Sequence, residues 1–190
     1  TCLYCSFTSY PIFSWKKRVS EYLTALEKEI DFVSSFYRDK ILDTIYIGGG
    51  TPTTLKAPEL ERLLSYIETK LDLSHLQEFT VEAGRADSIT RDKLEVLRKH
   101  GVTRISVNPQ TMNQKTLDLI GRRHTVEQVK EAFALAREVG FTNINMDIIL
   151  GLPEETEADV QYTIDEIVKM QPDSLTVHSL AIKRAAQMGQ

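Results

Sequence analysis

Short apolar, β-branched runs alternate with amphipathic helical patterns along this chain, and this alternation restricts the fold more than any other feature. Five such runs follow one another with helical patterns between them, and no hairpin signal joins two runs. This order predicts parallel strands connected by right-handed crossovers. The predicted class is α/β, as an open doubly wound sheet or part of a (β/α) barrel. The expected strands cover residues 41–47, 78–82, 102–107, 143–150 and 174–180.

Helices are predicted before the first strand and between successive strands. Ser14, Thr90 and Thr156 stand at N-cap positions, and Thr125 opens a capping box with Gln128. The expected helices cover residues 15–37, 58–70, 90–98, 113–120, 125–139 and 156–171. The apolar spacing places these residues on the inner faces of the first and last helices: Tyr22, Leu23, Leu26, Ile30, Val33 and Tyr37, then Val160, Ile164, Ile167 and Val168.

The composition is that of an ordinary globular protein, with 42% hydrophobic and 26% charged residues. No linker or low-complexity stretch divides the 190 residues, so residues 1–190 are expected to form one domain. The net charge of −4 gives no electrostatic reason to expect nucleic acid or a membrane as a partner. Two cysteines cannot form a disulfide framework, so a cytoplasmic protein is expected. Both ends look cut, which predicts a fragment.

The two cysteines, Cys2 and Cys5, form a C-x-x-C pair around Tyr4 that can surround one soft metal centre. Such a pair occurs in zinc knuckles, in thioredoxin-like redox motifs and in iron–sulfur sites. Zinc needs a second pair of Cys or His, and the four histidines are scattered. Residues 6–11 look like a loop, whereas a thioredoxin-like motif opens a helix. An iron–sulfur cluster with a further cysteine upstream remains the expectation.

Polar residues and glycines gather where the predicted strands end, which is where parallel α/β folds place their chemistry. Gly48, Gly49 and Gly50 expose backbone that suits a zwitterionic ligand, although a plain tight turn is the alternative. Acidic or amide side chains that interrupt or follow apolar strands are Glu82, Asn108, Gln110 and Asp147, and His178 lies near the end of the last strand.

Each of these residues also has an ordinary structural explanation. Glu82 fits an outward-facing strand position, and Gln110 fits a loop. Asp147 interrupts an apolar run, where a carboxylate needs a partner such as a ribose hydroxyl pair. A basic cluster is formed by Arg122, Arg123 and His124. It could cap the end of a helix in solvent, or it could have a functional role. The sequence leaves open which of the two arginines points inward. His75 and His100 are expected on the surface.

Taken together and in order, these motifs resemble one family. The chain is similar to a radical S-adenosylmethionine (SAM) enzyme of the oxygen-independent coproporphyrinogen III oxidase family. The tail, residues 173–184, most resembles the branch called coproporphyrinogen dehydrogenase in Gram-positive bacteria. The segments that carry the resemblance are residues 2–7, 48–53, 81–83, 108–111, 120–125 and 145–153.

The resemblance implies a radical SAM core built as a partial (β/α)6 TIM-like barrel, of which this chain carries five strands. Cys2 and Cys5 match the second and third cysteines of C-x-x-x-C-x-x-C, whose thiolates hold a [4Fe–4S] cluster, and the first would lie upstream of Thr1. The fourth iron is left for SAM. The resemblance implies that Tyr4 lies near the adenine of SAM and that Asp147 binds its ribose. Gly48, Gly49 and Gly50 would receive the methionyl amino group, with Thr51 in the same loop, and Arg122 would bind the methionyl carboxylate. Glu82 and Gln110 would also contact SAM.

The implied reaction is the oxygen-independent decarboxylation of coproporphyrinogen III to protoporphyrinogen IX in heme biosynthesis. A donor such as flavodoxin or ferredoxin reduces the cluster, and a 5′-deoxyadenosyl radical removes a propionate hydrogen before CO₂ is lost. Lys183 and Arg184 are candidates to pair with substrate propionates. The best-known decarboxylating members carry a fourth cysteine where this chain has Phe7, a feature shared with a sister group that binds and hands on heme. That heme-trafficking role, and a non-enzymatic domain with structural zinc, remain the alternatives.

Overall fold

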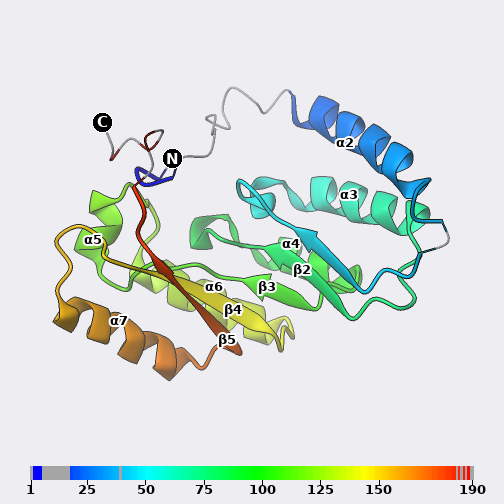
Figure 1. Cartoon of the computed structure of the whole chain (residues 1–190). Coiled ribbons are helices and arrows are strands. Elements are labelled where there is room, and N and C mark those ends of the chain that lie inside the picture. Colours follow the sequence, from blue (N-terminus) through cyan, green and yellow to red (C-terminus); the bar gives the residue numbers. More distant parts are fainter. Residues whose placement is uncertain are drawn as a thin grey trace.

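The computed structural model describes residues 2–5, 18–38 and 40–182, together with residues 184, 186 and 188. In this part of the chain five strands form one sheet in the order β1-β2-β3-β4-β5, and every neighbouring pair is parallel (Figure 1). The predicted α/β class with parallel strands is therefore confirmed. The strands are β1 (Thr44–Ile47), β2 (Glu78–Glu82), β3 (Arg104–Ser106), β4 (Ile144–Leu150) and β5 (Ser174–Ser179).

Helices connect the strands as expected. They are α2 (Val19–Ser34), α3 (Ala57–Lys70), α4 (Arg91–Lys99), α5 (Gln114–Leu119), α6 (Val126–Glu138) and α7 (Glu157–Met170), with short 3₁₀ turns η1 (Pro52–Thr54) and η2 (Ala86–Ser88). None of these helices is both long and apolar enough to cross a bilayer.

The two faces of the sheet differ in polarity because successive strand residues point to opposite sides. Phe79, Val81, Ile105 and Met146 are buried in the main core, which also contains residues of α3, α4, α6 and α7. The other face carries polar side chains from all five strands, and these side chains line a hollow. Among the described residues, the helices therefore pack on the apolar face of the sheet.

The helix α2 packs against α3, and the two lie side by side in Figure 1. Leu23 is buried against Leu63 and Ile67, and Arg62 forms a 2.7 Å ion pair with Glu27. The predicted inner face of this helix is only partly right, because Tyr22 is 56% exposed. Val33 and Tyr37 are exposed as well, while Leu26 and Ile30 are half-buried. The predicted cap at Ser14 and start at residue 15 lie outside the described residues.

Two of the predicted helix caps are confirmed and one is not. The hydroxyl of Thr125 accepts a 3.1 Å hydrogen bond from the N–H of Gln128, and Thr156 forms the same kind of capping box at α7. Thr90 stands at the N-cap of α4, but its hydroxyl bonds to the carboxylate of Asp92 instead of a backbone N–H. A nearby acidic side chain has therefore replaced the expected cap.

Three further expectations are corrected. The strand predicted at 41–47 begins at Thr44, because pairing with β2 begins with Thr44 opposite Glu78. Val168 is 64% exposed rather than inside, since α7 turns Thr163 and Ile167 toward the core. His100 is buried rather than on the surface, and its ring forms a hydrogen bond with Glu68.

Candidate functional site

The C-x-x-C pair forms a tight turn beside the last turn of α5. The N–H of Cys5 donates a 3.2 Å hydrogen bond to the carbonyl of Cys2, and the N–H of Leu3 donates a 2.9 Å bond to the carbonyl of Ile120. Both thiols are free and partly exposed. Tyr4 packs against an apolar cluster that includes Ile120 and Leu152. The turn therefore presents two thiols while its backbone is held by the fold.

Arg122 joins this turn to the ends of β2 and β3. Its Nη1 donates to the carbonyls of Gly84 at 2.9 Å and Asn108 at 3.1 Å, and its Nη2 donates to the hydroxyl of Tyr4 at 3.1 Å. Burial raises the pKa of Tyr4, while the charge of Arg122 acts in the opposite direction. Arg122 is 7% exposed and Arg123 is exposed, so Arg122 is the arginine that points inward.

The local backbone explains why Arg122 turns inward. Gly121 ends α5 with φ of +74°, and the N–H of Arg122 then bonds back to the carbonyl of Leu117 at 2.8 Å. This is the hydrogen-bond pattern of a Schellman motif, which directs the residue after the glycine toward the helix. A glycine directly before the pair Arg122 and Arg123 was the available sequence signal for this orientation.

The loop after β1 is held by the end of β2. Glu82 accepts a 3.2 Å hydrogen bond from the N–H of Gly49 and a further bond from the hydroxyl of Tyr46. Gly49 and Gly50 have φ of +75° and +53°, and no described heavy atom lies within 4 Å of where their Cβ atoms would be. Thr51 bonds within the same loop, to the carbonyl of Gly50 at 2.8 Å. The backbone at Gly49 and Gly50 therefore has open space beside it.

The polar face of the sheet encloses a hollow of ≈ 300 Å³. Asp147 lies in it, where its Oδ1 accepts a 2.6 Å hydrogen bond from Asn145 and its Oδ2 lies 3.7 Å from Nε2 of His178. Glu82 therefore shares this hollow with Asp147 rather than pointing away from it. The lining residues are Tyr46, Thr80, Glu82, Arg104, Ser106, Asn145, Asp147, Thr176 and His178.

Tyr46 is a member of this group that the sequence prediction did not include. Burial and the bond to Glu82 raise the pKa of Tyr46 to about 12, so the phenol stays protonated and donates. The signal was present in the sequence, because Tyr46 lies two residues before Gly48, on the strand that leads into the glycine loop.

Gln110 connects the end of β3 to β4. Its backbone has φ of +70°, and its N–H bonds to the carbonyl of Asp147 while its own carbonyl accepts from Ile149, each at 2.9 Å. The side chain is 6% exposed, and its Oε1 has no partner among the described residues. An amide oxygen held in this way is available to a ligand.

The structure also places two further candidate residues, His124 and Arg184. His124 is fully buried, and burial together with the charge of Arg122 lowers its pKa to about 4, so it is neutral. Arg184 is exposed near the end of the chain. Lys183 and Phe7 lie outside the described residues.

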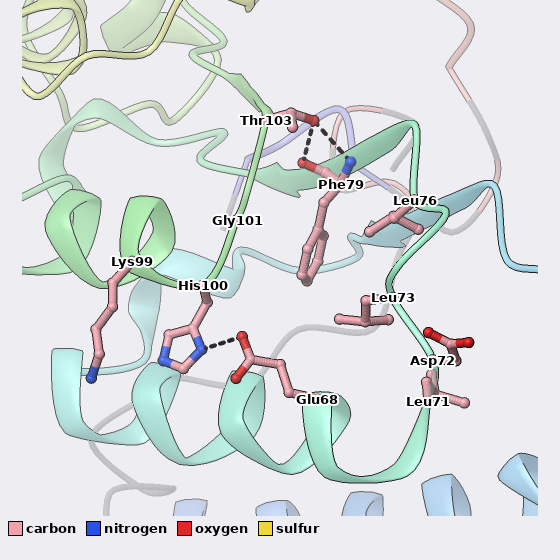
Figure 2. A pocket seen from close by; sticks show the side chains of 10 residues that line it. All are labelled: Glu68, Leu71, Asp72, Leu73, Leu76, Phe79, Lys99, His100, Gly101 and Thr103. Carbon is pink, nitrogen blue, oxygen red and sulfur yellow. Dashed lines mark hydrogen bonds and ion pairs between the residues drawn. The ribbon is translucent and has the colours of Figure 1, made fainter.

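A second, larger hollow of ≈ 600 Å³ lies at the opposite ends of the strands, where β2 and β3 begin (Figure 2). Leu71, Leu76 and Phe79 form its apolar wall, and His100 donates or accepts a 2.7 Å hydrogen bond with Glu68. It contains none of the predicted site residues. Size alone therefore does not identify the functional site here.

The residues at the carboxyl ends of the strands fit a sulfur-bound metal cluster next to a polar nucleoside ligand. Two free thiols lie on one turn, and Gln110 Oε1, Asn108 Oδ1 and Arg122 Nε are buried without partners in the described part of the chain. In the same part, no group of three or more His, Cys, Asp or Glu side chains is placed to hold a metal ion. Among the described residues, the thiols of Cys2 and Cys5 are free.

Comparisons with known proteins agree with this assignment. The model of the Radical SAM superfamily matches residues 1–167. The oxygen-independent coproporphyrinogen-III oxidase-like protein HemZ of Bacillus subtilis is 43% identical over 190 residues, which are 98% of this chain and 38% of that protein. The heme chaperone HemW of the same organism is 38% identical over 183 residues, which are 96% of this chain and 48% of that protein.

The structure of coproporphyrinogen III oxidase (HemN) from Escherichia coli, described as a radical SAM enzyme, superimposes with a TM-score of 0.89 and 28% identity. The match covers 99% of this chain and 44% of that one, so the chain spans less than half the length of these relatives. Fold, motif order and family model agree, and the chain belongs to the Radical SAM superfamily.

Proposed function

We propose that this chain binds a [4Fe–4S] cluster and SAM at the carboxyl ends of its strands and acts on a tetrapyrrole. Cys2 and Cys5 supply thiolate ligands to the cluster. The proposed SAM-binding residues are Tyr4, Gly48, Gly49, Gly50, Thr51, Glu82, Gln110, Arg122 and Asp147. We further propose that residues 1–190 form one radical SAM core and that the reaction is the decarboxylation of coproporphyrinogen III.

One observation carries this proposal: Arg122 and Glu82 link the thiol-bearing turn, the glycine loop and the strand ends into one site. Arg122 bonds to Tyr4 of the turn and to Gly84, which lies two residues after Glu82. Glu82 in turn bonds to Gly49. These segments are distant in sequence, and a common ligand explains why they converge.

When bound next to the thiols of Cys2 and Cys5, a cluster and SAM would supply radical chemistry to a substrate. The chain's own residues would bind and orient SAM. The buried guanidinium of Arg122 offers Nε to an anionic group, and the carboxylate of Asp147 suits a pair of ribose hydroxyls. The glycine backbone admits the methionyl end at close range.

The choice of substrate rests on two of the compared proteins. The HemN enzyme is named coproporphyrinogen III oxidase, and the HemZ protein is named coproporphyrinogen-III oxidase-like. A one-electron donor such as flavodoxin or ferredoxin would act as partner in the cytoplasm, where thiols stay reduced.

The test is anaerobic turnover. The chain, extended upstream by the first cysteine of C-x-x-x-C-x-x-C, is reconstituted with iron and sulfide, reduced, and mixed with SAM and coproporphyrinogen III. We expect 5′-deoxyadenosine together with a tetrapyrrole lighter by two CO₂. If neither product forms although the cluster is intact, the catalytic proposal is contradicted.

A second candidate is heme trafficking, which the 38% identity to the heme chaperone HemW favours. Phe7 stands where decarboxylating members of the family that the chain resembles carry a fourth cysteine. This function predicts that the protein binds heme when heme is added, seen by its absorbance, and that coproporphyrinogen III loses no CO₂ in the turnover assay. A zinc-only protein would instead contain zinc after purification and show no affinity for SAM.

A further inference from the structure

Lys93, on the first turn of α4, is directed into the fold rather than into solvent. Its Nζ donates hydrogen bonds of 2.6 Å to the carbonyl of Thr53 and 2.8 Å to the carbonyl of Ser88. Burial lowers the pKa of Lys93, while the charges of Asp92 and Glu59 act in the opposite direction. Partly burying an ammonium group costs free energy unless hydrogen bonds compensate, and here two carbonyls provide them.

The two carbonyls belong to the loops that follow β1 and β2. Thr53 lies at the end of the glycine loop and is fully buried. Its hydroxyl bonds to the hydroxyl of Ser88 at 2.6 Å, and Ser88 also bonds to the carbonyl of Arg85 at 2.7 Å. Lys93 therefore joins the loop after β1 to the loop after β2.

The glycine loop is consequently held at two points. Glu82 holds it near its start, through the N–H of Gly49, and Lys93 holds it near its end, through Thr53. Three successive glycines have more backbone freedom to lose than any other tripeptide. Fixing both ends before a ligand arrives removes part of the ordering cost from binding.

We propose that Lys93 is a positioning residue that holds the glycine loop, Gly48 to Thr53, in the conformation that receives SAM. This inference rests on the proposed function, in which that loop binds the methionyl end of SAM. Lys93 acts through the backbone, since its two hydrogen bonds within the described residues go to carbonyl oxygens.

Hydrogen exchange of the cofactor-free chain tests the loop part of the proposal. In Lys93→Met, we expect the amides of residues 48–51 and of Thr53 to exchange about tenfold faster, the effect of losing roughly one net hydrogen bond in a local opening. The matched control is Lys130→Met, which removes a 2.5 Å ion pair with Glu166 between α6 and α7 and should leave these amides unchanged. Unchanged exchange in Lys93→Met would overturn the proposal.

The affinity for SAM, measured on the cluster-reconstituted protein, tests the functional part. We expect Lys93→Met to weaken binding about tenfold, Lys93→Arg to restore most of it by donating to the same carbonyls, and Lys130→Met to match the wild type. Faster exchange with unaltered affinity would also overturn the proposal. A wild type that binds no SAM would contradict the proposed function itself, while the exchange experiment still decides whether Lys93 holds the loop.

Discussion

The N–H of Gly49 donates a 3.2 Å hydrogen bond to the carboxylate of Glu82, so the last residue of β2 holds the loop that follows β1. The same carboxylate accepts a bond from Tyr46, the residue before Ile47 at the end of β1. Glu82, for which an outward-facing strand position was the alternative explanation, is thus the link between two strand ends.

Replacing Glu82 by Ala should therefore loosen the glycine loop. The change leaves the N–H of Gly49 and the hydroxyl of Tyr46 without their acceptor, and we expect SAM affinity to fall about fivefold to tenfold for roughly one net hydrogen bond. Isothermal titration calorimetry measures it. Glu78→Ala is the control, because Glu78 begins the same strand and bonds to Thr80 instead. Equal effects of the two changes would contradict the assigned role of Glu82.

Gly48 should be the loop glycine that tolerates a side chain least well. A Cβ there would lie 3.1 Å from Cδ of Glu82 and closer still to the ring of Tyr46. We expect Gly48→Ala to push Tyr46 away from Glu82, so the pKa of Tyr46 falls from about 12 toward the ordinary 10.0. Absorbance of the phenolate, with Tyr46→Phe to assign the signal, measures this.

Gly50→Ala is the matched control for this change. Its Cβ would meet open space, so its cost is the backbone strain of φ +53°, about 1–2 kcal/mol. We expect it to leave the titration of Tyr46 unchanged. A pKa of about 12 retained in Gly48→Ala would show that the ring does not need to move.

The two adjacent arginines should differ strongly in their effect on stability. Arg122→Ala removes the donors to Gly84, Asn108 and Tyr4, and we expect the free energy of unfolding to fall by about 3 kcal/mol. Arg123→Ala alters an exposed side chain and should change it by less than about 0.5 kcal/mol. Urea denaturation measures both. Arg122→Lys keeps the charge without the planar fork, so an intermediate loss is expected.

The parallel architecture was predictable because it depends on patterns that the sequence displays directly. Apolar strands bounded by helix caps fixed the element order, and β2 begins and ends where expected, at Glu78 and Glu82. Strand ends were harder, because β1 begins at Thr44, where its partner strand begins. The length over which two strands pair depends on both strands, so the residues of one strand alone do not predict where pairing begins.

The site was predictable in its members but not in its contacts. Strand-end polar residues and the family resemblance pointed to Glu82, Gln110 and Asp147. The choice between Arg122 and Arg123 depends on the positive φ of Gly121, which turns one side chain inward. The roles of Tyr46 and Lys93 were not predicted, because their partners are distant in sequence. Glu82 lies 36 residues from Tyr46, and the Thr53 carbonyl lies 40 residues from Lys93.

Finally, His124 should make the fold sensitive to mild acid. Its folded-state pKa is about 4, below the ordinary 6.5, because burial and the charge of Arg122 disfavour the protonated ring. The unfolded chain therefore takes up this proton first, so the stability contribution is complete above pH 6.5 and is lost as the pH falls toward 4. For one proton the slope is at most about 1.4 kcal/mol per pH unit. In denaturant unfolding between pH 7.5 and pH 4.5, the free energy of unfolding of the wild type should fall as the pH falls, and His124→Phe should lack this part of the loss. The control His75→Gln alters an exposed histidine and should keep the full acid sensitivity. A His124→Phe variant that loses stability in parallel with the wild type would contradict a neutral, buried His124.

Should His124→Phe fail to fold, the proton NMR titration of the His124 ring in the wild type decides the same question, with a midpoint near 4 expected.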